Sequence, residues 1–445
     1  MDIPNSKRTT KLAVVGGGVA GIGAAYRLHT AGYQVDLIER DDVLGGRFGV
    51  DRLGDRPVMM GGKNIGRSYT QLRAFLAALE VDEFEYFGVN TSRIINGNLI
   101  TFDSTNNKLD LIRKFAKMGT TADLAKLLWL MIKVRRNESN RFLGSETFSK
   151  VGAKRDHKPL TAYFGPELVN NMFRPLTVRL NGAEPDEMYL GNFGVNLGLA
   201  GAFDQLTGGI QPALDSLSEC VSVQLNSHVH GLIIRDGRVQ GLNISQNGGA
   251  PQQVAYDGVV VATPAYAAAE ITKPALPTLS DLLMDVRYFP AAVAVIEYDR
   301  PVFDNVVRAI AVDAGHCSNA GVYGVNDLNI VRYTFSGRAA RPMPSADALE
   351  SWIDDAEKLI KQLLGIGELS RINVRTRIWP AAYCAYLPFY GEFLSKVRTE
   401  VASVPGIELA GDYLRGAPLE ACFRSGQEAA QRVMADLTAR MDRAA

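Results

Sequence analysis

The sequence predicts an α/β fold in which a parallel-sheet domain is interwoven with an α+β domain that carries a helical lid. Three observations lead to this prediction. A strand, a glycine-rich turn and a helix open the chain, a helical pattern occupies about residues 109–172, and segments with the strand period return after Val221. Because 445 residues exceed what one hydrophobic core usually organises, two domains are expected.

The first elements form a strand, helix and strand unit: Lys11–Val15, Val19–Thr30 and Val35–Ile38. Its turn has the spacing of the Rossmann-like dinucleotide-binding fingerprint. Gly16 permits the tight turn, Gly18 lets the backbone approach a pyrophosphate, and Gly21 allows close packing of helix on strand. Glu39 closes the second strand, where a carboxylate accepts hydrogen bonds from ribose hydroxyls and repels a 2′-phosphate. We therefore expect a dinucleotide other than NADP at this turn.

The later elements follow from changes in the hydrophobic period and from turn residues such as Asp236-Gly237. The expected helices are Leu72–Leu79, Asp347–Leu364 and Leu419–Met441, and the expected strands are Leu99–Phe102, Val221–Leu225, Val229–Ile234, Val239–Ile244, Gly258–Ala262, Val293–Tyr298, Ile330–Phe335 and Ile407–Ala410. The predicted dinucleotide-binding domain is discontinuous and comprises residues 1–75, 205–274 and 400–445. The predicted substrate domain comprises residues 76–204 and 275–399, with the helical insertion in its first part.

The composition is that of an ordered globular protein without overall charge. Hydrophobic residues make up 47% of the chain, and 48 Lys and Arg balance 48 Asp and Glu, so a nucleic-acid partner is not expected. No apolar run reaches the roughly 18 residues of a membrane-spanning helix. The polar segment Met1–Lys11 lacks the pattern of a secretory signal, so we expect the mature chain to start near Met1.

The four cysteines lie far apart and form no CxxC or Cys/His spacing of the kind that metal sites and disulfide scaffolds use: Cys220, Cys317, Cys384 and Cys422. They are interpreted as reduced thiols. We therefore expect no metal site and a cytoplasmic location.

A second glycine motif follows the first unit. The stretch from Glu39 through Arg40 to Gly45-Gly46-Arg47 resembles the second signature of the superfamily of monoamine oxidases, protoporphyrinogen oxidases and phytoene desaturases. The resemblance implies FAD, a flavoprotein fold of the GR2 type, and Arg47 as the cation beside the phosphates. An arginine suits this role because its planar fork donates two parallel hydrogen bonds to phosphate oxygens.

Further stretches along the chain match the same superfamily, from the first glycine loops to the C-terminal helix. By the resemblance, Gly61 and Gly62 bring a loop to the flavin, and Val229 lies in the strand that contacts adenine through its backbone. The resemblance also implies that Gly411 and Asp412 complete the flavin site, with Asp412 near the ribityl chain or the pyrophosphate. The helix that begins near Leu419 would direct its positive end at the flavin ring and stabilise negative charge there.

The substrate half is less informative. Tyr383 and Tyr386 occupy the region where superfamily members place aromatic residues against the flavin, although a packed β-rich core would use the same residues. In monoamine oxidases a cysteine of this region carries the flavin. Here Cys384 is followed by Ala385 rather than an aromatic residue, so we expect FAD to be bound non-covalently and Cys384 to be a buried thiol.

Lys63 is the unusual residue of the glycine loop, where superfamily members often carry a histidine or a neutral residue. If it is buried beside the flavin, it can lose its proton readily and polarise flavin or substrate. A solvated loop lysine is the alternative. Lys63, Tyr383 and Tyr386 are the predicted catalytic residues.

The segment of residues 111–136 alternates apolar residues with lysines and arginines. A basic amphipathic helix of this kind can lie on an anionic bilayer, which predicts a peripheral membrane contact. A lid helix that packs on the core with a solvated basic face is the alternative.

Taken with the resemblance, the residues predict an FAD-dependent oxidoreductase that dehydrogenates a small, largely apolar organic substrate by hydride transfer to flavin N5. Desaturation of a C–C bond and oxidation of a C–N bond, as in a flavin amine oxidase, both remain open. So does a flavin-dependent isomerisation without net redox change, and a cofactor-holding protein without turnover is a further alternative. The sequence does not indicate the oligomeric state.

Overall fold

Five parallel strands form the central sheet of the first domain, in the order β10-β2-β1-β14-β20. Their bounds are Lys11–Val15 for β1, Gln34–Ile38 for β2, Ser222–Gln224 for β10, Gly258–Val261 for β14 and Ile407–Leu409 for β20. The computed structural model describes residues 10–86, 90–95, 97–103, 107–199, 201–312 and 315–444, so most of the polar segment Met1–Lys11 lies outside the described residues. The α/β fold with a parallel sheet confirms the predicted fold class.

Both faces of this sheet are covered, which explains why its strands are continuous apolar runs. Leu12 and Val14 of β1 pack into one core with α2 (Val19–Thr30) and α16 (Leu419–Ala444), whereas Ala13 and Val15 pack into a second core on the opposite face. The first face also carries α3 (Thr70–Ala78) and α10 (Gln211–Cys220), and the second carries α11 (Ala265–Thr272), α12 (Pro277–Met284) and α14 (Tyr390–Ala402). A three-stranded meander adjoins it: β11 (Ser227–Arg235), β12 (Arg238–Gln246) and β13 (Gln252–Ala255).

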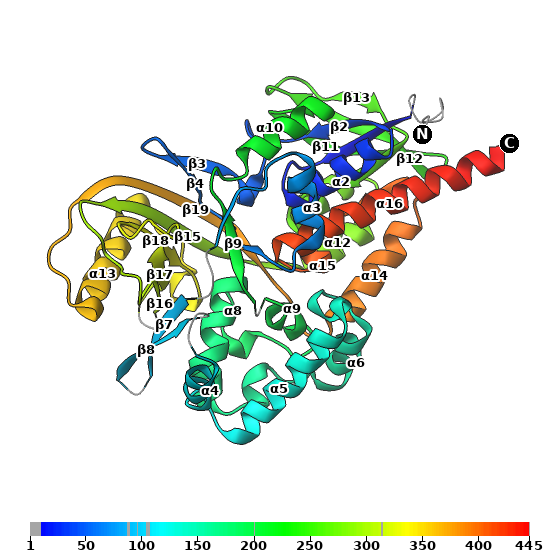
Figure 1. Cartoon of the computed structure of the whole chain (residues 1–445). Coiled ribbons are helices and arrows are strands. Elements are labelled where there is room, and N and C mark those ends of the chain that lie inside the picture. The colour runs from blue at the N-terminus through cyan, green and yellow to red at the C-terminus, as the bar shows by residue number, and fades with distance from the viewer. Residues whose placement is uncertain are drawn as a thin grey trace.

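The second domain is built on a seven-stranded sheet in the order β19-β15-β18-β17-β16-β7-β8. The bounds are Asn90–Ile95 for β7, Asn98–Asp103 for β8, Arg287–Tyr298 for β15, Ala309–Ala311 for β16, Cys317–Val322 for β17, Ile330–Phe335 for β18 and Arg371–Ala385 for β19. One face packs on α13 (Ala346–Leu364), which lies on the outer side of the molecule (Figure 1). The other face meets the hairpin of β3 (Val50–Leu53) and β4 (Arg56–Met59), so this face points toward the first domain.

The predicted helical stretch contains α4 (Lys108–Ala116), α5 (Thr121–Arg136), α6 (Glu146–Arg155) and α7 (Pro166–Leu168), followed by α8 (Arg174–Asn181) and α9 (Phe193–Leu197). These helices gather in the lower part of Figure 1 and, apart from α4, share a core of their own. A small sheet of β5 (Ile65–Gly66), β9 (Phe203–Leu206) and β6 (Phe84–Tyr86), together with α15 (Asp412–Arg415), completes the chain. The exact domain boundaries stay a prediction.

Candidate cofactor and substrate site

The glycine turn after β1 places the first residues of α2 against open space. Gly16 has a φ of +104°, and an added Cβ at Gly21 would lie 1.8 Å from the Gly16 carbonyl oxygen, so both positions require glycine. At Gly18, the N-cap of α2, an added Cβ would meet no atom within 4 Å. The N-terminus of α2, with its unpaired N–H groups, therefore borders a space that can receive an anion.

The carboxylate of Glu39 is fixed beside this turn at the end of β2. Its Oε2 accepts a hydrogen bond of 2.6 Å from Gly17 N–H, and its Oε1 accepts one of 2.9 Å from Asp41 N–H. The next residue, Arg40, is exposed and pairs only loosely with Asp41, at 3.4 Å. Val229 is buried in β11, whose first residue donates its N–H to the Glu39 carbonyl. Glu39 and Val229 thus share one end of the sheet, whereas Arg40 points to solvent.

The second and third glycine segments lie against the first. Gly45 N–H donates to the Gly17 carbonyl at 2.9 Å, and an added Cβ at Gly46 would lie 3.6 Å from Gly18 Cα. An added Cβ at Gly61 would lie 1.6 Å from the Arg47 carbonyl oxygen, so these two backbones touch.

The third segment also reaches the start of α16. At Gly62 an added Cβ would lie 3.2 Å from the side chain of Leu419, the first residue of that helix. The loops predicted to contact FAD are therefore brought together from both ends of the chain.

Arg47 joins three distant parts of the molecule. Its Nη1 donates to Asp412 Oδ2 and to the Ala382 carbonyl, each at 2.8 Å. Asp412 is buried and also accepts a hydrogen bond of 2.8 Å from Tyr288 Oη. Burial lowers the pKa of Arg47, but the Asp412 carboxylate together with Tyr288 and Cys422 raises it more, so the guanidinium stays charged. Gly411, just before Asp412, has a φ of +153° and donates its N–H to Ser425.

Tyr386 and Cys384 lie in the same buried region as Asp412. Tyr386 Oη accepts a hydrogen bond of 2.7 Å from Ala417 N–H and holds the connection into α16. Burial raises the pKa of the Cys384 thiol well above its usual value, so the sulfur stays protonated and a poor nucleophile.

Lys63 is buried, which excludes the alternative of a solvated loop lysine. Its Nζ donates to Gln205 Oε1 at 2.6 Å and to the Tyr323 carbonyl oxygen. Burial lowers the pKa of Lys63 well below its usual value, and the charge of Arg332 lowers it further. Tyr383 is half-buried and lies within electrostatic range of Arg332, so Lys63 and Tyr383 border the same region and Tyr386 does not.

Sequence reasoning missed several polar groups of this region, including Thr263, Tyr288, Arg179 and Arg332. The Thr263 hydroxyl is buried beside Gly16 and has no hydrogen-bond partner among the described residues. A charged residue inside the apolar strand of residues 330–335 is a signal that could have identified Arg332. The sequence around Arg179 carries no comparable signal.

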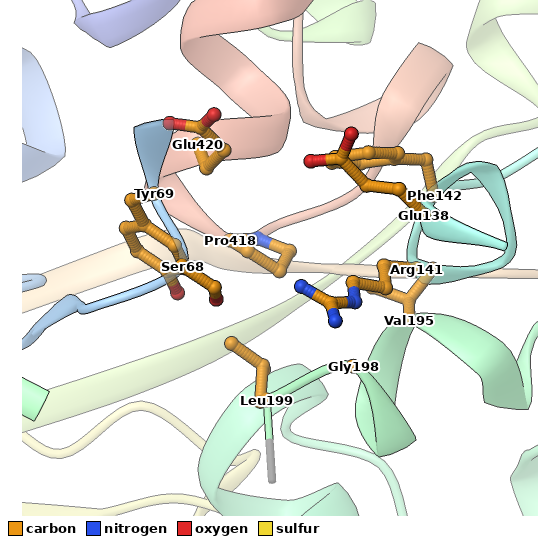
Figure 2. Close-up of a pocket in the computed structure, with 10 residues that line it drawn as sticks. All are labelled: Ser68, Tyr69, Glu138, Arg141, Phe142, Val195, Gly198, Leu199, Pro418 and Glu420. Atoms are coloured by element: carbon orange, nitrogen blue, oxygen red, sulfur yellow. The ribbon is translucent and has the colours of Figure 1, made fainter. Parts of the chain in front are cut away.

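Two neighbouring cavities border the helical region, and the first of them also borders the start of α16. Figure 2 shows the first, where the Arg141 guanidinium extends into the space between Pro418 and Leu199. The second has a volume of about 260 Å³, shares Arg141 with the first, and reaches Met131 and Val134 of α5. Together they connect the helical region with the residues that precede and follow Leu419.

Comparison with known proteins agrees with this geometry. A family model described as flavin containing amine oxidoreductase matches residues 19–434. Protoporphyrinogen oxidase 2 of Arabidopsis thaliana is 20% identical over 96% of this chain and 94% of its own length. Polyamine oxidase 4 of Oryza sativa subsp. japonica is 24% identical over 48% of this chain and 44% of its own length.

The solved structure of cyclohexylamine oxidase from Brevibacterium oxydans IH-35A covers 96% of this chain and 99% of its own, with a TM-score of 0.73 and 17% identity. At this identity the likeness is one of fold, and it extends over almost the whole molecule.

Proposed function

Since this chain belongs to the flavin-containing amine oxidoreductase family and is an FAD-dependent oxidoreductase, we propose that it dehydrogenates a small, largely apolar organic substrate. The family assignment confirms the resemblance seen in the sequence. When bound, FAD supplies the hydride acceptor at N5. The substrate and the bond that is oxidised belong to the proposal, and the two leading forms are desaturation of a C–C bond and oxidation of a C–N bond.

The described residues fit FAD. The open space at Gly18 suits the pyrophosphate, and the fixed carboxylate of Glu39 suits the adenosine ribose. The unpartnered Thr263 hydroxyl, next to the same turn, offers a further donor or acceptor. Arg47 and Asp412 would hold the middle of the cofactor. The convergence of the three glycine segments on the start of α16 is the observation that carries the proposal.

The chain's own residues would bind and orient the substrate and control its protons. The aromatic side chain of Tyr383 and the neighbouring strands of the second sheet would exclude water from the reacting bond. Lys63 Nζ can give or take a proton without leaving its place, because a neutral amine still donates to both Gln205 and the Tyr323 carbonyl. We therefore propose Lys63 as the proton-exchanging residue.

Gly18→Val tests the cofactor site. Gly18 has an ordinary φ of −77° and free space around it, so the variant should fold, yet its side chain would occupy the place of the pyrophosphate. We expect the purified variant to lack flavin. Gly367→Val, at an exposed position with free space in the second domain, should keep it. A Gly18→Val protein with one flavin per chain would contradict the placement.

Anaerobic bleaching of the bound flavin by a panel of amines, polyenes and tetrapyrrole precursors tests the reaction. Bleaching by an amine with loss of two hydrogens would identify C–N oxidation, and bleaching by a polyene or a tetrapyrrole precursor would identify the desaturating form. A product of unchanged mass would identify isomerisation instead, and absence of any bleaching would point to a cofactor-holding protein.

We also propose that the helical region contacts a membrane surface. No described helix is long and apolar enough to span a bilayer. However, α4 has no buried residue, and Leu109 and Ile112 on it are 64% and 63% exposed. On α5, Leu128 and Trp129 are 58% and 54% exposed, and its last turn carries three cations. This apolar and basic surface suits an anionic bilayer, and the cavity beside Met131 would lead from it toward the cofactor.

A further inference from the structure

Two arginines, one on the face of the second sheet that points toward the first domain and one on α8, have no anionic partner among the described residues. Arg332 lies in the middle of β18, and its Nη1 donates to the Met59 carbonyl at 2.8 Å. Arg179 lies in the last turn of α8, and it forms no hydrogen bond or ion pair with any residue that the structure describes. No carboxylate is among the groups that influence either guanidinium.

Both arginines lie close to Tyr383. The two guanidinium groups lie within electrostatic range of each other and of the Tyr383 hydroxyl. The Tyr383 ring lies against the end of α8, since an added Cβ at Gly182 would be 3.0 Å from it. Each arginine keeps part of its surface accessible, yet burial lowers the pKa of both. Both guanidinium groups are therefore largely shielded from bulk solvent.

Arg332 adjoins the loop that would contact the flavin. Arg332 is bonded to Met59, the last residue of β4, and the chain then runs through Gly61 and Gly62 to Lys63. Lys63 adds a third cationic group and is influenced by both arginines.

The nearest carboxylates do not balance the two arginines. Glu85 and Asp327 act on Lys63, and Asp327 is already paired with Arg56. Two guanidinium groups without a counter-charge in a low-dielectric interior are unfavourable, and a bound anion removes that cost.

We propose that the substrate carries a carboxylate, which Arg179 and Arg332 bind with the help of the Tyr383 hydroxyl. The inference rests on the proposed function, because it assumes that the substrate occupies the side of the flavin loop where Lys63 lies. Burial raises the pKa of Tyr383, so its hydroxyl remains a hydrogen-bond donor. The substrate class is then an organic acid with an apolar body. A substrate that is only a protonated amine would be repelled by the two arginines, which favours C–C over C–N oxidation in this chain.

Binding of three small aromatic probes tests this inference without turnover. Benzoate carries the charge, benzamide is its neutral counterpart, and benzylamine carries the opposite charge. Calorimetric titration of the flavin-loaded protein, read together with the visible spectrum of the flavin, should show benzoate binding at least about ten-fold more tightly than the other two. Arg179→Gln should weaken benzoate binding by about ten-fold or more, because it removes a charged hydrogen bond. Arg440→Gln, which removes an exposed cation at the far end of α16, should not.

Equal affinity for benzoate and benzamide, or wild-type benzoate affinity in Arg179→Gln, would overturn the inference. Arg332→Gln provides a second variant in case Arg179→Gln does not fold. If a variant loses benzoate binding but keeps one flavin per chain, the result supports carboxylate binding by the two arginines. The retained flavin shows that the cofactor site is undisturbed. If wild-type protein contained no flavin, the proposed function would fail, and titration of benzoate into that protein would still decide whether the arginines bind an anion.

Discussion

Lys63 is a cation that the fold holds in an unfavourable environment, and its effect on stability depends on pH. Its folded pKa lies well below the value of about 10.4 for an unfolded lysine. Between these two values the unfolded chain binds the extra proton, so the contribution of Lys63 to stability rises as the pH rises.

Lys63→Met should therefore flatten this dependence. We expect the free energy of unfolding of the variant, minus that of the wild type, to be larger at about pH 6 than at about pH 9. The lost hydrogen bonds lower the variant's stability by the same amount at both pH values, so they do not affect this difference. Urea unfolding at the two pH values measures this, with Lys273→Met at an exposed position as the matched control. If the free energy of unfolding changed equally with pH in wild type and Lys63→Met, Lys63 would keep its proton when folded. Wild-type turnover and an unchanged flavin spectrum in the same variant would exclude a catalytic role.

At the scale of elements, α5 performs two tasks with two faces. Leu127 and Leu130 bury one face in the helical core, whereas Leu128 and Trp129 leave apolar surface on the other. Leu128→Glu should leave the fold intact and reduce sedimentation with vesicles that contain phosphatidylglycerol, because it removes apolar contact and adds a repelled charge. Met284→Glu, at a similarly exposed position on α12, is the control and should bind vesicles as the wild type does. Equal sedimentation of both variants would show that α5 does not contact the membrane.

At the scale of the whole molecule, Arg47 connects the two domains through its ion pair with Asp412 in the first and its hydrogen bond to the Ala382 carbonyl in the second. It ties the N-terminal glycine segment to the C-terminal segment and, through the Ala382 carbonyl, to β19. Arg47→Met leaves the buried Asp412 carboxylate without its cation and should cost about 3–5 kcal/mol of stability. Asp412→Asn in the same chain should recover part of the loss. Thermal unfolding measures these stabilities. Arg432→Met, which breaks an exposed pair with Glu408, is the control and should cost about 1 kcal/mol or less.

The parts of this architecture that depend on near neighbours could be predicted from the sequence. The roles of Gly16 and Gly21 follow from a turn of a few residues, and the strand of residues 330–335 has the predicted bounds because β-branched and aromatic residues fill it apart from Arg332. Strand β19 was not predicted. Its first half alternates Ile372 and Val374 with arginines and Asn373, but both apolar residues are exposed, so no buried face marks the strand. Its place is set by pairing with β15 about 80 residues earlier.

The candidate site also has parts that local sequence predicts and parts that it does not. The loops that would hold FAD carry local glycine signals, whereas the substrate side depends on long-range contacts. Arg179 and Arg332 are about 150 residues apart in sequence and meet only because α8 packs against β17 and β19. The sequence pattern around each arginine contains no information about the other. The same applies to Tyr386: its place at the flavin face stays a prediction, and nothing in the sequence indicated that its hydroxyl accepts the Ala417 N–H near the start of α16.

The order of the strands in the parallel sheet has a consequence for synthesis on the ribosome. Four of the five strands are available once residue 261 has emerged, but β20 at residues 407–409 and Asp412 come near the end of the chain. A nascent chain must therefore carry an open sheet edge and an unpaired Arg47 through most of its translation. Loading of the flavin belongs to the last stage of biogenesis, and the cell has to protect this half-built domain from aggregation until then.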